Sequence, residues 1–193
     1  QWSSSAASDV YKRQVQEGDL DESPISAEGK DVIIIGGGDT GADCLGTSHR
    51  HGARSIHQFE IMPRPPEERP EANPWPTYPM VYKVTSAHEE GGEREYAINT
   101  VRFVGDEDGN LTGLDTVRVE QVVTDGHMRL QPVEGSEQHF PAQMVFLAMG
   151  FTGPEQNALV EQFGVDVTDR GNVARDDEWA TNVDGVFVAG DMG

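Results

Sequence analysis

The chain has 193 residues, of which 36% are hydrophobic and 25% are charged, and its formal net charge is −20 at pH 7. This composition supports a buried core and excludes a disordered chain. A chain this acidic repels phosphate backbones and anionic lipid, so we expect neither a nucleic acid nor a membrane surface as partner. No apolar run reaches the ~20 residues that span a bilayer.

Cysteine and histidine usage excludes two kinds of site. Cys44 is the only cysteine, so neither an internal disulfide nor a four-cysteine metal or iron–sulfur site can form within this chain. A single cysteine fits a reducing, cytoplasmic setting. His49 and His51 are two residues apart and face apart on a helix, so they make a poor metal pair and we expect no metal site. No serine or cysteine nucleophile has an obvious base at motif spacing, so we expect no catalytic side chain.

The first 14 residues stand apart from the rest. They show neither a helical nor a strand period, and they resemble an adapter-derived peptide at the ends of translated reading frames. A polar loop is the alternative. We exclude residues 1–14 from fold reasoning and expect the remainder to be a fragment of a longer protein.

The next segment predicts one strand–helix–strand unit. Val32-Ile33-Ile34-Ile35 is a β-branched run typical of a buried parallel strand, and a glycine cluster follows it. We expect a helix over 40–50 and a second strand over 53–61.

The remaining elements indicate a mixed α/β chain. The proline-rich stretch 62–79 excludes a helix interior or a central strand and predicts an ordered loop. An antiparallel meander is expected within 96–133, with strands at 96–104, 111–119 and 128–133. Beyond it we expect a strand at 144–148, a helix at 155–163 and a strand at 186–189.

Gly36-x-Gly38-x-x-Gly41 fits the dinucleotide-binding fingerprint. Gly36 permits the tight turn out of the strand, Gly38 lets the backbone approach a pyrophosphate, and Gly41 permits close packing of helix and sheet. The flanking strand and helix are those that the motif requires. The alternative is a glycine turn that serves chain geometry alone.

Two charged residues bear on which nicotinamide cofactor is bound. Glu60 lies 19 residues after Gly41, where a carboxylate accepts from the ribose 2′-hydroxyl and repels a 2′-phosphate, which favours NADH. Arg64 favours NADPH, because an arginine can pair with that phosphate. Glu60 as a solvated charge at a strand end is the alternative, so the choice of cofactor stays open.

Two further strand ends carry small or acidic residues. Gly190-Asp191 follows the apolar run 186–189, where ligands bind in open α/β sheets, and the carboxylate could hold a flavin ribityl hydroxyl. Ala148-Met149-Gly150 follows another predicted strand. Both patterns are common in turns without a ligand.

Residues 15–193 resemble the later part of the small (beta) subunit of glutamate synthase. The stretches that carry the resemblance are GKDVIIIGGGDTGADC (29–44), QFEIMPRPP (58–66), NPWP (73–76), MGFTGP (149–154) and TNVDGVFVAGDMG (181–193). The glycine and AGD motifs alone would indicate only a flavoprotein with two dinucleotide sites, whereas NPWP and the EIMPRPP loop are more particular.

The resemblance implies a two-dinucleotide-binding flavoprotein fold. Residues 15–145 would form a Rossmann-like NAD(P)H-binding domain with an inserted antiparallel meander, and residues 146–193 would return to a truncated FAD-binding domain. By the same resemblance the nicotinamide dinucleotide would contact Gly36, Gly37, Gly38, Asp39, Thr40 and Gly41. Gly190 and Asp191 would hold FAD, and Ala148, Met149 and Gly150 would line the FAD side of the hinge.

The implied chemistry is electron input. NAD(P)H would pass a hydride to FAD, and electrons would reach the large (alpha) subunit through 4Fe-4S clusters to make glutamate from glutamine and 2-oxoglutarate. The cysteine-rich region that holds the clusters and the first FAD fingerprint are not in this sequence, so the fragment itself is expected to be inactive. The alternatives are a non-catalytic dinucleotide-binding fragment and the electron-input module of another oxidoreductase, such as dihydropyrimidine dehydrogenase.

Overall fold

The computed structural model describes residues 17–19, 21, 24–150, 153–155 and 158–192. The chain divides into two compact units, Gln1–Met149 and Gly150–Gly193. The segment set aside above, residues 1–14, lies outside the described residues. So do residues 156–157 of the helix expected from residue 155.

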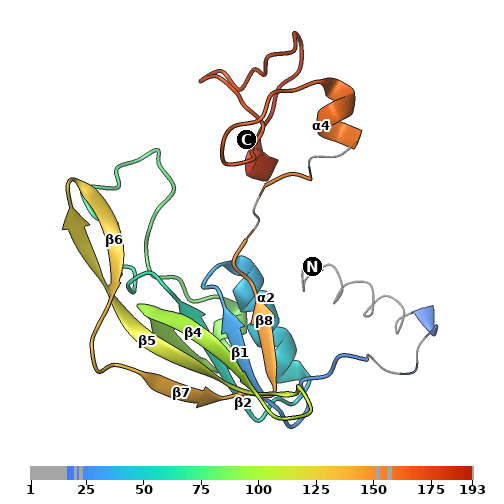
Figure 1. Cartoon of the computed structure of the whole chain (residues 1–193), viewed down its shortest axis with the longest axis vertical. Coiled ribbons are helices and arrows are strands. Elements are labelled where there is room, and N and C mark those ends of the chain that lie inside the picture. The colour runs from blue at the N-terminus through green and yellow to red at the C-terminus, as the bar shows by residue number, and fades with distance from the viewer. Residues whose placement is uncertain (1–16, 20, 22–23, 151–152, 156–157, 193) are drawn as a thin grey trace. The chain divides into compact units, whose positions relative to one another are not determined.

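A four-stranded parallel sheet forms the centre of the first unit (Figure 1). Its order is β3-β2-β1-β8, built from β1 (Asp31–Ile35), β2 (Ser55–Glu60), β3 (Glu93–Tyr96) and β8 (Met144–Leu147). Helix α2 (Asp39–Arg50) joins β1 to β2, so the predicted strand–helix–strand unit is confirmed. The central strand β1 is β-branched and almost fully buried, as a strand covered on both faces requires.

A second, antiparallel sheet follows in sequence. It contains β4 (Ile98–Gly105), β5 (Leu111–Thr124) and β6 (His127–Pro132) in that order, and β7 (Gln138–Pro141) pairs back with β5. The expected strand at 96–104 was partly wrong, because Tyr96 belongs to β3 of the parallel sheet and Ala97 turns with a φ of 53°. Strand β5 also continues five residues beyond its expected end.

Among the described residues of the first unit, three elements were not predicted: β7, and the two elements with the weakest sequence signals, β3 and helix α3 (Ser86–Glu89). Strand β3 has the sequence EREY, which lacks an apolar alternation, and it forms because it pairs with the edge of β2. Helix α3 is four residues long and follows the proline-rich loop. Pairing with β2 stabilises β3, and a side-chain cap stabilises α3. Neither interaction produces a periodic pattern of hydrophobic residues in the local sequence.

The parallel sheet is the middle layer of three. Val32 and Ile34 point to one face and pack with Leu45 of α2. Ile33 points to the other face, where Phe59 of β2 and the antiparallel sheet complete a second cluster that includes Ile98, Leu114 and Phe140. Alternate residues of β1 therefore serve two cores, one on each side of the sheet.

The second unit is small and contains little regular structure. It has α4 (Ala158–Phe163), the 3₁₀ turn η1 (Gly190–Met192) and a core of Val160, Val173 and Val188. The strand expected at 186–189 was wrong, since only Phe187 forms an isolated bridge, with Ala180. A strand needs a hydrogen-bonded neighbour along its length, and among the described residues the segment 186–189 forms a single β-bridge.

An ion pair fixes the start of β1. Asp31 accepts from Arg54 Nε at 2.8 Å and from Ser55 Oγ at 2.7 Å, and its pKa is lowered to about 2, chiefly by the Arg54 hydrogen bond. We expect Asp31→Asn to lower the free energy of unfolding by about 1–2 kcal/mol at pH 7. Because the folded pKa is depressed, this contribution is present above about pH 4 and disappears towards pH 2. Urea unfolding of both proteins at pH 7 and pH 3 measures it, and an equal difference at both pH values would contradict the assignment.

Candidate dinucleotide site

The glycine loop leaves the carboxyl end of β1 and enters α2, and the end of β2 holds it in place. Gly36 N donates to the Phe59 carbonyl at 2.8 Å, and Gln58 Nε2 donates to the Gly36 carbonyl at 2.9 Å. Gly37 N donates to Glu60 Oε2 at 2.9 Å. Three consecutive residues of β2 therefore hold Gly36 and Gly37.

Three glycines of the loop are required by the protein's own packing. A Cβ on Gly36, whose φ is +131°, would overlap the Ala148 carbonyl, and a Cβ on Gly37 would overlap the Glu60 carboxylate. A Cβ on Gly41 would overlap the Gly36 carbonyl and lie 2.5 Å from Gln58 Nε2. Close contacts within the chain explain these glycines without a ligand.

Gly38 is different. A Cβ built on it meets no described atom within 4 Å, and its φ of −82° suits any residue. Gly38 is the N-cap of α2, and no side chain of the described residues caps that helix end. Gly38, Asp39 and Thr40 are exposed there. The result is an open helix N-terminus with exposed backbone, the arrangement that binds a phosphate.

The Glu60 carboxylate is fixed beside this loop. Oε2 accepts from Gly37 N, and Oε1 accepts from Met62 N at 3.0 Å. Each carboxylate oxygen has a second lone pair, so both can still accept from a ribose hydroxyl. Glu60 is therefore held in place by backbone hydrogen bonds and is more than a solvated charge at the end of a strand.

Arg64 lies on an aromatic surface at the same strand ends. Its guanidinium is 4.0 Å from the ring centre of Tyr82 and pairs with Glu67. Arg94 approaches the same ring at 4.7 Å, and Tyr96, beside Tyr82, is the strand partner of Glu60. Sequence reasoning missed Arg94 and Tyr82, because β3 and the loop bring them near Glu60 only in three dimensions.

The other predicted site residues fall in two places. Ala148 is buried, and its carbonyl lies against Gly36, while Met149 and Gly150 are exposed at the junction of the two units. Gly190 and Asp191 lie in η1 of the second unit. The contact of all five residues with FAD stays a prediction.

Two other groups with potential reactivity or metal-binding ability have ordinary explanations. Burial, and secondarily Asp43, raises the pKa of the Cys44 thiol to about 11, so the thiol is protonated and unreactive at neutral pH. His57, Glu93 and Glu95 bring potential ligand atoms within 4.8 Å of one another. Glu95 is already engaged by Arg118 Nη2 at 2.9 Å, and Glu93 is largely exposed.

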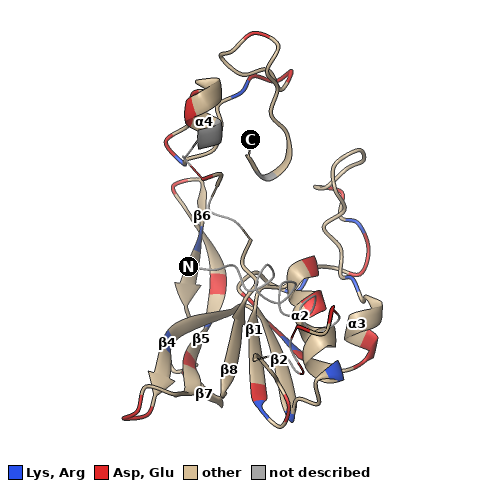
Figure 2. Cartoon of the chain, turned by 90° about the vertical axis from the view of Figure 1, so that its right-hand side faces the viewer, with Lys and Arg blue, Asp and Glu red and all other residues tan. Residues whose placement is uncertain are grey.

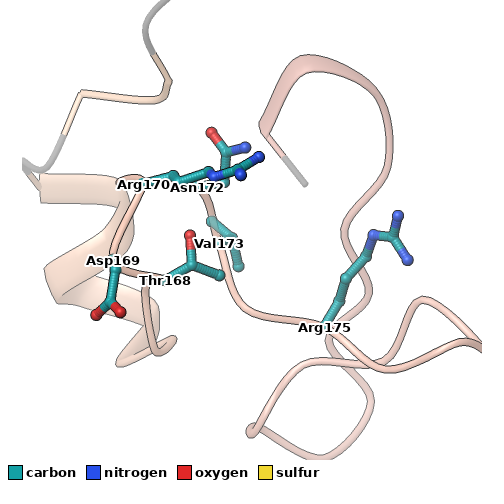
Figure 3. Close-up of a pocket in the computed structure, with 6 residues that line it drawn as sticks. All are labelled: Thr168, Asp169, Arg170, Asn172, Val173 and Arg175. Carbon is teal, nitrogen blue, oxygen red and sulfur yellow. The ribbon is translucent and has the colours of Figure 1, made fainter. Parts of the chain in front are cut away.

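The second unit contains an open hollow, which Figure 3 shows. The side chains around it do not converge on one point, since Asp169 points away from Arg170 and Asn172. Figure 2 shows acidic segments on many elements, as the net charge of −20 implies. No helix among the described residues is long and apolar enough to cross a membrane.

Comparison with known folds gives the class of protein. The sequence model of the pyridine nucleotide-disulphide oxidoreductase family matches residues 112–193. A solved structure of thioredoxin reductase from Lactococcus lactis, in its FR conformation, is similar with a TM-score of 0.53 and 14% identity. The match covers 86% of this chain and 45% of that one. The chain therefore has the mixed α/β fold of the pyridine nucleotide-disulphide oxidoreductases.

Curated relatives narrow the class. The glutamate synthase [NADPH] small chain of Mycobacterium tuberculosis H37Rv is 57% identical over 95% of this chain. The glutamate synthase [NADH] of Schizosaccharomyces pombe is 48% identical over 86% of it, and the putative oxidoreductase AegA of Escherichia coli is 34% identical over 90%. The chain is a homologue of one part of the glutamate synthase small chain, which confirms the predicted resemblance.

The match is to a portion of each relative. The chain spans 38% of the length of the M. tuberculosis small chain, 8% of the S. pombe protein and 26% of the E. coli protein.

Proposed function

We propose that this chain binds NAD(P)H at the glycine loop between β1 and α2. The observation that carries the proposal is Gly38, whose missing side chain is not explained by any described contact of the protein itself. Backbone amides around Gly38, Asp39 and Thr40 would face the pyrophosphate, and Gly36, Gly37 and Gly41 would shape the turn. Glu60 would accept from the adenosine ribose.

In a longer protein like the glutamate synthase small chain, electrons would enter at this site from the bound nucleotide. A bound nicotinamide cofactor would supply the hydride, and the residues of this chain would bind and orient the cofactor. FAD, with Gly190, Asp191 and the 148–150 segment at its site, would be the acceptor. Electrons would then pass through 4Fe-4S clusters outside this sequence to a glutamate synthase large subunit in the cytoplasm, for glutamate synthesis from glutamine and 2-oxoglutarate.

A second candidate is a dinucleotide-binding fragment without catalysis. It is favoured for the chain by itself, since the chain spans only 38% of its bacterial relative. The electron-input module of another FAD-dependent oxidoreductase, such as dihydropyrimidine dehydrogenase, would use the same dinucleotide site.

Calorimetric titration of the purified chain with NADH and with NADPH tests the binding proposal. We expect saturable binding at one site per chain. A folded chain that binds neither nucleotide would contradict the proposal. The visible absorbance of the purified chain distinguishes the two candidates, because a bound flavin is required for hydride acceptance and its absence leaves a binding fragment alone.

Glu60→Gln tests the ribose assignment. The variant keeps an acceptor for Gly37 N and removes the negative charge that repels a 2′-phosphate. We expect the ratio of NADPH to NADH affinity to rise by about tenfold, equivalent to about 1.4 kcal/mol. Glu107→Gln is the control, because Glu107 is exposed in the turn between β4 and β5 and belongs to neither the glycine loop nor the Arg64 ion pair. An equal change in both variants would mean that general charge, and not Glu60, sets the preference.

A further inference from the structure

We propose that Gln58 and His88 are positioning residues of the dinucleotide site: together they hold the Gly36 carbonyl, and with it the glycine loop, in the binding geometry. The expected effect on NAD(P)H binding rests on the proposed function, whereas the positioning of the loop rests on the contacts alone. The contacts that carry it link three segments far apart in the sequence, at residues 36, 58 and 88.

Gln58 is a buried polar side chain whose two amide atoms are both used. It is 2% exposed on β2, surrounded by the core between the sheet and α2. Its Nε2 donates to the Gly36 carbonyl at 2.9 Å, and its Oε1 lies 3.1 Å from His88 Nε2. A buried amide left without a partner is costly, so the loss of either contact favours rotation of the Gln58 side chain away from the loop.

The hydrogen bonds assign the protonation of His88. Because Gln58 Nε2 must donate to a carbonyl, Gln58 Oε1 faces the histidine and accepts from Nε2–H. His88 Nδ1 is then the acceptor, and it receives the Thr85 backbone N–H at 3.1 Å and the Thr85 hydroxyl at 3.0 Å. His88 is therefore neutral with its proton on Nε2.

The short helix α3 positions His88 beside Gln58. Four residues make barely one helical turn, which is too short for helix propensity to stabilise, and the helix packs on α2 through Ala87, which lies against Gly46. Thr85 and His88 form a capping box that stabilises it. The end of the proline-rich loop is thereby connected through His88 and Gln58 to the Gly36 carbonyl.

A movement of the Gly36 carbonyl would also displace the N-terminus of α2, where the dinucleotide is proposed to bind. Gly41, at the first turn of α2, packs so closely that a Cβ on it would overlap both this carbonyl and Gln58 Nε2. Rotation of the Gln58 amide therefore removes the donor and alters the contact between loop and helix. The exposed N-terminus of α2 would then no longer be held in a fixed position relative to the end of β2.

Paired variants test the proposal by binding and by hydrogen exchange. We expect His88→Ala and Gln58→Leu to weaken NAD(P)H binding by about tenfold or more. His88→Gln, which again offers an N–H to Gln58, should recover most of the affinity, whereas His88→Leu, which fills similar space without a donor, should not; equal recovery in both would mean that His88 only fills space. Ser48→Ala is the control, because the Ser48 side chain is equally buried and its hydroxyl donates to the Cys44 carbonyl within α2, away from the glycine loop.

The ligand-free chain gives a second readout. We expect faster amide exchange at Gly36 and Gly37 in His88→Ala and unchanged exchange in Ser48→Ala, and ¹⁵N shifts of His88 that report a neutral ring protonated at Nε2. Unchanged exchange in His88→Ala, or a ring protonated at Nδ1, would overturn the proposal. If the wild-type chain binds no dinucleotide, the proposed function fails, while the exchange and tautomer measurements still decide whether these residues position the loop.

Discussion

Replacing Gly38 by valine is expected to abolish NAD(P)H binding while leaving the fold intact. A valine side chain would occupy the space in front of the α2 N-terminus, where the pyrophosphate approaches the backbone. We expect the dissociation constant to rise by about a hundredfold or more, equivalent to at least about 2.7 kcal/mol. Calorimetric titration measures the loss, and circular dichroism measures the fold.

The structure explains why this loss should be separable from stability. A Cβ at Gly38 meets nothing within 4 Å among the described residues, and its extended backbone accepts a β-branched residue. Gly38→Ser is the matched control for the helix cap, since serine is a favourable N-cap with a smaller side chain. It should preserve stability and reduce affinity less than valine does. Unchanged affinity in the valine variant would remove the glycine loop from the functional argument.

Replacing Gly36 by alanine is expected to destabilise the first unit by about 3–5 kcal/mol. Gly36 has a φ of +131°, which side-chain-bearing residues rarely adopt, and its Cβ would overlap the backbone carbonyl of Ala148. That carbonyl cannot move freely, because Ala148 N donates to the Ile35 carbonyl at 2.8 Å. Relief of the overlap requires β1 and β8 to separate at their carboxyl ends.

Urea unfolding followed by circular dichroism measures this effect. Gly126→Ala is the control, because Gly126 also has a positive φ, +75°, but its Cβ would meet nothing described within 4 Å. The control measures the cost of an ordinary left-handed backbone conformation, about 1 kcal/mol, so the excess at Gly36 reports its less favourable φ and the overlap with Ala148. Equal destabilisation in the two variants would show that the close approach of Ala148 contributes nothing.

Gly36→Ala and Gly38→Val together separate two roles within one motif. The first glycine is needed so that β8 can lie against the loop, and in our proposal the third glycine, Gly38, leaves room for a ligand. The sequence motif is the same whether a glycine serves packing or ligand binding. Only the structural contacts around each glycine distinguish the two roles.

The sequence by itself determined the parallel strands β1, β2 and β8, helix α2 and the position of the glycine loop. These elements carry strong local signals: a β-branched run, a glycine cluster and a residue alternation. The family resemblance was equally readable, because NPWP and the EIMPRPP loop are unusual combinations. Glu60 was placed correctly beside the loop because the spacing between fingerprint and second strand is set by one helix and one turn.

Tertiary structure alone decided the rest. Strand β3 forms by pairing with β2, and the four-residue α3 depends on a side-chain cap, so neither has a periodic pattern to detect. The prediction of a strand at 186–189 was wrong because an apolar run forms a strand only when it pairs along its length with a neighbouring segment. Gln58 donates to the Gly36 carbonyl and contacts His88, which lies 30 residues further along the chain, and hydrogen bonds between distant segments leave no local signal in a sequence.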